Sequence, residues 1–373
     1  MKIDRRLIKN FDLVTFLIII GMAVIGIMTI YSATRHPIPG GGMPTYYMRQ
    51  LYWLLVSILS LIAIVSFDYM WLRRFAYLFY GAGIFLLVLV LFLGRTGMGA
   101  QRWLNLGIFS FQPSEVFRLL YLITISRYLS ELQGEVTLAS LVRTFFLLTF
   151  VPIAMLIEQP DLGTAVILLL VFFSVVTVKG LHRKALVLVV LIGLVSVPFL
   201  GHIFWGGLKD YQKNRLVAFL EPESDPSGIG YHINQSKIAI GSGGFSGKGY
   251  LKGTQGPFRF LPEKHTDFVF SVFAEEWGFA GSFVLLFLYL SLILRGLDTA
   301  RKAKDEFGSL LALGISFMFT IYFFVNVGMT LGIMPVVGVP LPFMSYGGTS
   351  LLANFIAAGI LINIRTRRFE LFY

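Results

Sequence analysis

The feature that most constrains the fold is a series of apolar stretches, each close to the roughly 20 residues that cross a bilayer as a helix. Hydrophobic residues make up 56% of the chain and charged residues 14%, whereas soluble proteins average about 45–50% and about 25%. We therefore predict an all-α integral membrane protein, a polytopic bundle of about ten transmembrane helices in a single domain over residues 1–373. The predicted spans are Asp12–Ser32, Gln50–Phe67, Phe75–Gly94, Ser114–Leu129, Thr144–Ile157, Leu162–Val178, Ala185–Phe204, Asp267–Leu294, Gly308–Ile333 and Ser345–Ile364.

Lysine and arginine in the short connections set the expected orientation, because cytoplasmic connections carry the excess of these residues. With both termini in the cytoplasm, the basic residues cluster at the termini and near positions 73–74, 179–184 and 295–304. The short outer connections hold only Arg35, Arg49, Arg95, Arg102 and Arg118. The net charge of +11 then favours anionic membrane lipid, rather than nucleic acid, as the partner. The absence of cysteine excludes disulfides, thiolate metal sites and cysteine nucleophiles.

A large extracytoplasmic loop, residues 205–266, is expected between the seventh and eighth spans. Basic and apolar residues mix between Lys209 and Leu220, as in an amphipathic helix at a membrane interface, and Tyr231–Ile240 is a second short helix. The run Gly241–Gly249 lacks the Gly-Lys-Ser/Thr ending of a nucleotide-binding loop. It is either a flexible loop or a backbone that meets a phosphate together with Lys237 or Lys248.

The stretch from Leu261 to Gly278 places several ionisable side chains at the mouth of a very apolar segment. Continued as a helix, it puts Asp267, Ser271 and Glu275 on one face through i, i+4 spacing. A carboxylate at the edge of a membrane is costly and usually functional. The alternative is that Thr-Asp before an apolar run is an ordinary helix N-cap.

Three further clusters are expected on the outer side: Arg102–Glu115, Glu158–Asp161 and Pro335–Gly348. Together with Lys237–Asp267 they could close into one cavity. Glu115 and Arg118 are three residues apart within an apolar run, so they can pair inside the membrane, as a structural contact or as a substrate contact. Asp161 either caps the next span or contributes to the cavity. The loop Pro335–Gly348 either packs or contacts substrate. The histidines lack the spacing of a metal site.

In these segments the chain resembles the SEDS family (shape, elongation, division and sporulation), over nearly its whole length. The resemblance rests on Arg102-Trp103 with Leu106-Gly107, Gln112-Pro113-Ser114-Glu115, Glu158-Pro160-Asp161-Gly163-Thr164, Pro262-Glu263-Lys264-His265-Thr266-Asp267-Phe268 and Pro340-Pro342-Phe343-Ser345-Tyr346-Gly347-Gly348. It implies a peptidoglycan glycosyltransferase of the cell-elongation type. Such an enzyme polymerises lipid II into β-1,4 glycan at the outer face of the cytoplasmic membrane and releases undecaprenyl diphosphate.

The resemblance also implies roles for individual residues. The family's essential carboxylate falls on Asp267, which is expected to act as general base or to hold a divalent cation, Mg²⁺ or Mn²⁺; no cofactor is otherwise expected. Arg118 stands where the family usually has lysine, and the planar guanidinium is not a simple replacement for an ammonium. The expected substrate-binding residues are Arg102, Gln112, Glu115, Arg118, Asp161, Lys237, Lys264, His265 and Ser345.

The resemblance also implies a partner, a class B penicillin-binding protein, which is the transpeptidase of the elongation machinery. A lipid II flippase is the competing function, and it should carry polar groups at the midplane and on both sides of the membrane. A non-catalytic scaffold would leave the ionisable cluster around Asp267 without a purpose.

Overall fold

The computed structural model describes residues 10–35, 45–97, 100–105, 107, 110–182, 187, 210–221, 228–254 and 265–368. Lys264 and, apart from residue 187, the predicted seventh span lie outside these residues. The helices are α2 (Leu13–Thr34), α3 (Tyr46–Ser66), α4 (Met70–Leu93), α5 (Pro113–Ser130), α6 (Leu138–Thr144), the π-helical η1 (Phe145–Phe150), α7 (Val151–Glu158), α8 (Leu162–Gly180), α10 (Asp210–Leu220), α11 (Ile229–Ser242), α12 (Val269–Arg301), α13 (Glu306–Thr330) and α14 (Gly348–Thr366).

Within the described part of the chain, eight helical segments are long and apolar enough to cross a membrane: α2, α3, α4, the continuous α6–η1–α7 segment, α8, α12, α13 and α14. The 18-residue α5 is also long enough for a span, but it carries Glu115, Arg118 and Arg127. The predicted polytopic, mainly helical membrane fold is confirmed.

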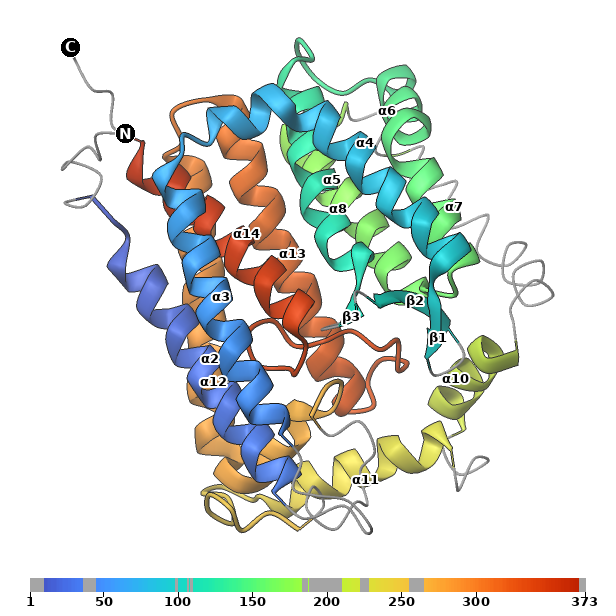
Figure 1. Ribbon diagram of the computed structural model, residues 1–373, viewed down its shortest axis with the longest axis vertical. Coiled ribbons are helices and arrows are strands. Elements are labelled where there is room, and N and C mark those ends of the chain that lie inside the picture. The colour runs from blue at the N-terminus through green and yellow to red at the C-terminus, as the bar shows by residue number, and fades with distance from the viewer. Residues whose placement is uncertain are drawn as a thin grey trace.

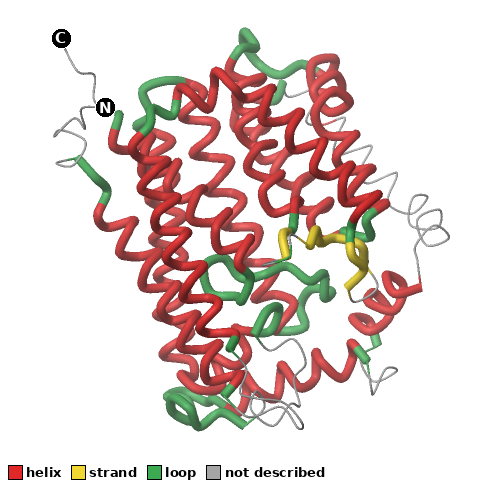
Figure 2. The backbone as a smooth tube through the Cα atoms, in the orientation of Figure 1, coloured by secondary structure: helices red, strands yellow, loops and turns green. Residues whose placement is uncertain are grey.

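The helices form one bundle with two distinct ends (Figure 1). The first turn of α2 and the last turn of α14 lie together at what we call the terminal end, where Asp12 forms ion pairs with Arg295 and Arg365. The other half of the molecule, the loop end, carries α10 and α11 toward the bottom of the view and, nearer the middle, three short strands and the connection 331–347 (Figure 1 and Figure 2). Helix α14 is largely buried and packs along α3. Most of the polar residues expected to be functional lie at or near the loop end.

The connection between α4 and α5 contains a small antiparallel sheet that the sequence did not predict. Strands β1 (Arg95–Gly97), β2 (Ala100–Asn105) and β3 (Ser110–Phe111) pair in the order β1-β2-β3. The register places Arg95 opposite Trp103 and Leu104 opposite Phe111. Arg102 lies on β2, and this strand contacts both α4 and α5.

The glycine run Gly241–Gly249 packs against a break in α12, so the phosphate-loop and flexible-loop interpretations are both wrong for its backbone. Gly278 has φ +63° inside α12, and the interrupted helix exposes carbonyl groups. The amides of Lys248 and Gly249 donate to the carbonyls of Glu275 and Glu276 at 3.0 and 2.9 Å. In return, the amide of Phe279 donates to the carbonyl of Gly244 at 2.9 Å.

Gly247→Ala should destabilise the protein by more than about 1 kcal/mol. Gly247 has φ +76°, and an added Cβ would overlap the Glu276 carbonyl; the left-handed backbone alone costs an alanine roughly 1 kcal/mol. The matched control is Gly241→Ala, because nothing lies within 4 Å of its added Cβ. Thermal unfolding in detergent should show a lower midpoint for Gly247→Ala alone. Equal midpoints for both variants would contradict the interlocked loop.

Candidate active site

Asp267 lies in a turn before α12, and two parts of the chain fix its position. The helix begins at Val269, so the expected helical register of Asp267 is wrong, and the N-cap is Phe268, with no side-chain cap hydrogen bond. The N-cap interpretation of Asp267 is therefore wrong as well. The Asn326 side chain of α13 donates to the Asp267 carbonyl at 3.0 Å. A Cβ added at Gly338 would lie 3.4 Å from Asp267 Oδ2, so the carboxylate lies against the connection 331–347.

The turn that carries Asp267 is tied to the start of α14. The Ser345 hydroxyl donates to the Thr266 carbonyl at 2.6 Å and accepts from the Leu341 amide at 2.8 Å. Gln50 of α3 donates to the Ser345 carbonyl at 3.1 Å and accepts from the Gly347 amide at 3.2 Å. Ser345 therefore acts on the backbone beside Asp267, which is a positioning role.

His265 belongs to an aromatic cluster at the same turn. Its ring lies 4.6 Å from that of Tyr46 and 5.4 Å from that of Tyr346, measured between centroids. The Tyr346 amide donates to the His265 carbonyl at 2.8 Å. Burial raises the pKa of the Tyr346 hydroxyl, and the positive charge of Arg49 opposes that rise. The cluster holds the turn next to α3.

Arg102, Gln112 and Asp161 come together in a second group at the starts of α5 and α8. Arg102 Nη1 lies 3.6 Å from Asp161 Oδ1, and its other terminal nitrogen donates to the Pro160 carbonyl. Ser114 donates to Asp161 Oδ2 at 3.2 Å and accepts from Gln112 at 3.2 Å. Asp161 is the N-cap residue of α8 but makes no side-chain cap hydrogen bond. Its carboxylate instead neutralises Arg102.

Glu115 and Arg118 form the expected ion pair, at 3.0 Å, with both side chains 3% exposed. Arg118 also donates to Asn354 of α14 at 2.7 Å, and its guanidinium lies 4.3 Å from the centre of the Tyr322 ring of α13. One guanidinium therefore connects α5, α13 and α14, which an ammonium could not do with the same geometry. The pair lies within the first two turns of α5.

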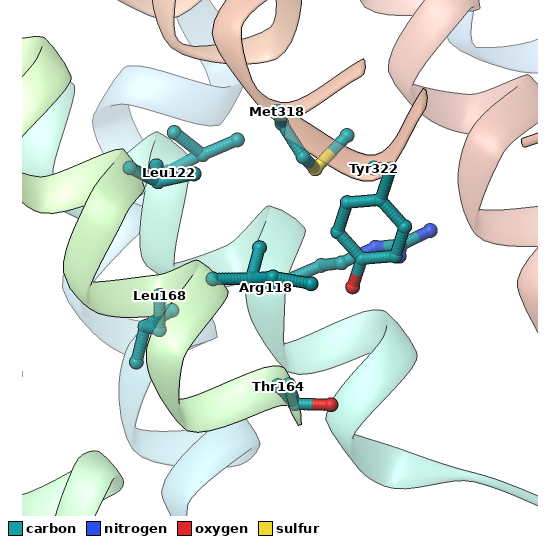
Figure 3. Close-up of a pocket in the computed structure, with 8 residues that line it drawn as sticks. Arg118, Leu122, Thr164, Leu168, Met318 and Tyr322 are labelled. Carbon is teal, nitrogen blue, oxygen red and sulfur yellow. The ribbon is translucent and has the colours of Figure 1, made fainter. Parts of the chain in front are cut away.

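A small cavity adjoins Arg118 between α5, α8 and α13 (Figure 3). Apolar side chains and the hydroxyl-bearing residues Thr164 and Tyr322 line it. Its volume is about 10 Å³, which is the room needed by one water molecule. The cavity is too small for a sugar or a diphosphate.

Both groups of site residues approach the connection 331–347. Gly163, two residues after Asp161, is so close to this connection that an added Cβ would lie 2.8 Å from the Val337 carbonyl. The neighbouring Gly338 faces Asp267. The start of α8 and the Asp267 carboxylate thus approach adjacent residues of one short backbone segment.

Comparison with known proteins identifies the family. The model of the FtsW/RodA/SpoVE family of cell cycle proteins matches residues 12–370. The chain belongs to this family. The peptidoglycan glycosyltransferase MrdB of Escherichia coli K12 is 40% identical over 361 residues, which cover 96% of this chain and 94% of that protein.

Two solved structures share the fold. One is a peptidoglycan synthase complex in which polymerisation and crosslinking are coordinated, with a TM-score of 0.81 and 32% identity over 96% of this chain and 99% of that chain. The other is the rod shape determining protein RodA of Thermus thermophilus, with a TM-score of 0.70 and 29% identity over 96% and 98% of the two chains.

Of the remaining expected residues, Lys237 lies against the connection 331–347 and Lys264 lies outside the described part of the chain. Lys237 is exposed, and its side chain passes over Gly332. A Cβ added to Gly332 would lie 2.7 Å from Lys237 Nζ. Glu275 is fully buried and binds Lys248 Nζ at 2.6 Å and the Thr254 amide at 2.7 Å. It is thus engaged with the glycine run.

Sequence reasoning missed four residues at the site: Gln50, Asn326, Gly338 and Arg215. A buried amide inside an apolar span was the available signal for Asn326, whose side chain also donates to the Val339 carbonyl at 2.7 Å. For Arg215, the sequence predicts only that it belongs to an amphipathic helix at the membrane interface. Over the residues described, no cluster of three or more His, Cys, Asp or Glu side chains could hold a metal ion.

Proposed function

We propose that the protein is a peptidoglycan glycosyltransferase that polymerises lipid II through Asp267. Membership of a family whose relative MrdB is named for this activity supports the reaction class. The observation that supports the site is the position of the Asp267 carboxylate against Gly338. Hydrogen bonds to the carbonyls of Asp267 and Thr266 hold the turn that carries it. A catalytic group needs this kind of fixed geometry.

The reaction is a single displacement with inversion. The 4-hydroxyl oxygen of the acceptor sugar forms a bond to the anomeric carbon of the donor, and the bond from that carbon to the diphosphate oxygen breaks. The hydroxyl proton passes to Asp267, and the bonding pair leaves with undecaprenyl diphosphate. General base catalysis of this kind contributes about 10²- to 10⁴-fold in rate.

The other expected contacts divide into two roles. Arg102 and Asp161 neutralise each other, so they shape the wall of the site, and their joint charge is small. Gln112 continues that wall through Ser114, while Glu115 and Arg118 hold the helices behind it. Lys237, Lys264 and the His265 cluster remain proposed contacts for the lipid II headgroup.

A divalent cation fits the site only together with substrate. Mg²⁺ is commonly held by one or two carboxylates plus phosphate oxygens of the substrate. Asp267 and the donor diphosphate would supply such a set, without a preformed cluster of protein ligands. Bound there, Mg²⁺ or Mn²⁺ would offset charge on the diphosphate.

The terminal end is proposed to face the cytoplasm and the loop end the outside, since basic residues crowd the short connections of the terminal end. We also propose that the protein works in cell elongation with a class B penicillin-binding protein, which would crosslink the glycan. The similar synthase complex supports a partner of this kind. Anionic lipid would contact the basic terminal end.

The test is polymerisation of purified lipid II by the purified chain with its cognate transpeptidase, followed by gel separation of the glycan. Polymer is expected from the wild-type complex, including one whose transpeptidase active site has been inactivated. If the complex with the wild-type chain yields no polymer from lipid II, the proposed function is wrong.

A further inference from the structure

We propose that Arg215 is a second catalytic residue, whose guanidinium binds the diphosphate of the lipid-linked donor beside Asp267. The inference rests on the proposed function and adds the group that receives the leaving charge. Arg215 belongs to α10, which the sequence suggested only as an interfacial helix.

The geometry at Gly338 brings Arg215 to the proposed catalytic carboxylate. A Cβ added at Gly338 would lie 3.4 Å from Asp267 Oδ2 and 3.7 Å from Arg215 Nη1. Gly338 has φ +73°, a conformation that glycine adopts without strain. Three segments distant in sequence therefore meet at one backbone position: α10, the turn before α12, and the connection 331–347.

The orientation of α10 is the second observation. Leu216, Val217 and Leu220 are exposed, with Leu220 73% exposed, whereas Ala218 is only 1% exposed. Arg215 is half-buried and shares the face of Ala218 through i, i+3 spacing. The apolar side of α10 thus faces outward, as expected at a lipid surface, and the Arg215 guanidinium lies next to Gly338.

The chemistry favours arginine at this place. When the bond from the anomeric carbon to the diphosphate oxygen breaks, the electron pair stays on the diphosphate and its negative charge grows. A guanidinium offers parallel N–H donors that match phosphate oxygens, and such charge-assisted bonds are about twice as strong as neutral ones. Asp267 receives the proton of the acceptor hydroxyl, and Arg215 binds the departing diphosphate. The two charged side chains therefore act on the attacking and the leaving oxygen of the same displacement.

Two other cations of the loop end each pair with a carboxylate of their own. Arg102 pairs with Asp161, and Lys248 pairs with Glu275. The first pair joins β2 to the start of α8, and the second joins the glycine run to α12. Arg215 differs because the carboxylate near it is the one to which we assign the proton transfer.

The experiment measures the binding of farnesyl diphosphate, a short prenyl diphosphate, to the purified full-length chain, with farnesol as the uncharged control. Arg215→Ala and Arg215→Gln should weaken binding of farnesyl diphosphate by about 10- to 100-fold, the effect of losing hydrogen bonds to a charged group. Arg215→Lys should fall between these variants and wild type. Lys213→Ala, which removes the same charge from the same helix, should change affinity less than about twofold, because residues two apart face different directions.

The outcomes separate this proposal from the role of Asp267. Unchanged affinity for farnesyl diphosphate in a folded Arg215→Gln protein would overturn the proposal, and this variant decides the matter if Arg215→Ala fails to fold. An equal loss in Lys213→Ala would also overturn it, because the effect would then come from general charge. If Arg215→Gln loses binding while Asp267→Asn still polymerises lipid II, Arg215 keeps its role and Asp267 does not.

Discussion

Replacing Asp267 with asparagine is expected to lower the rate of glycan polymerisation by about 10²- to 10⁴-fold and to leave the fold intact. Asparagine has nearly the same shape but cannot accept the hydroxyl proton. The hydrogen bond that the structure shows from Asn326 goes to the backbone carbonyl of residue 267, so it survives the substitution. The measurement is the initial rate of lipid II polymerisation by the purified complex, alongside thermal unfolding of the same protein.

Two further variants sharpen this prediction. Asp267→Glu keeps the carboxylate but displaces it by one methylene, so it should retain part of the activity. Asp298→Asn makes the same chemical change at the terminal end, where Asp298 pairs with Lys302 and Arg365, and it should polymerise normally. An Asp267→Asn protein with wild-type rate would refute the general base, and recovery of its rate at high Mg²⁺ would favour the cation-binding role instead.

Removing one partner of the buried Glu115–Arg118 pair is expected to have the largest effect on stability. Glu115→Gln leaves the Arg118 guanidinium, 3% exposed, without its counter-charge, which costs about 3–5 kcal/mol for a buried pair. The bonds to Asn354 and Tyr322 remain, so the loss should come mainly from the unpaired charge. Unfolding by detergent titration, with folded protein followed by fluorescence, gives the change in unfolding free energy.

The double variant Glu115→Gln with Arg118→Met should recover much of that loss, because it removes both buried charges. Lys302→Ala is the matched control, since it breaks the more exposed Asp298–Lys302 pair, and exposed pairs contribute about 1 kcal/mol or less. A Glu115→Gln protein as stable as the Lys302→Ala protein would mean that the buried pair adds nothing to the fold.

The spans and the buried ion pair were predictable because both follow from local rules. A long apolar segment must form a helix in a membrane, and α8 begins at Leu162 and ends at Gly180, against a predicted Leu162–Val178. Glu115 and Arg118 share a helix face by spacing alone. The α6–η1–α7 segment was underestimated because its first turns, from Leu138, carry polar residues that lower the apolar signal.

The register around Asp267 was not predictable because distant residues determine it. The helical pattern continues through residue 267, but hydrogen bonds from Asn326 and Ser345 to this turn accompany a helix that starts only at Val269. The strand pairing of residues 95–111 depends in the same way on partners that a short strand does not specify.

The orientation of α10 could not be predicted from the sequence, for a different reason. Its mixed apolar and basic residues show that the helix has two faces, but they do not show which face meets lipid. The structure exposes Leu220 and turns Arg215 inward. The glycine run was misread similarly, because small residues permit both flexibility and close packing, and here they pack against the break at Gly278.

The placement of polar groups also bears on transport as an alternative. The Glu115–Arg118 pair lies within two turns of the loop end of α5, and Asp267 precedes α12. Further along α5 and α13 the buried polar side chains Thr124, Ser126 and Ser316 are uncharged. A charged headgroup that crossed the membrane along these helices would therefore meet no counter-charge from them.

The most direct test of the account places the wild-type complex in vesicles whose outer leaflet alone contains fluorescent lipid II. Lipid II that reaches the inner leaflet and glycan polymer formed outside are then measured in the same sample. We expect polymer to form while the lipid II of the inner leaflet stays at the level of protein-free vesicles. Lipid II that crosses to the inner leaflet without any polymer would contradict the account and identify a flippase.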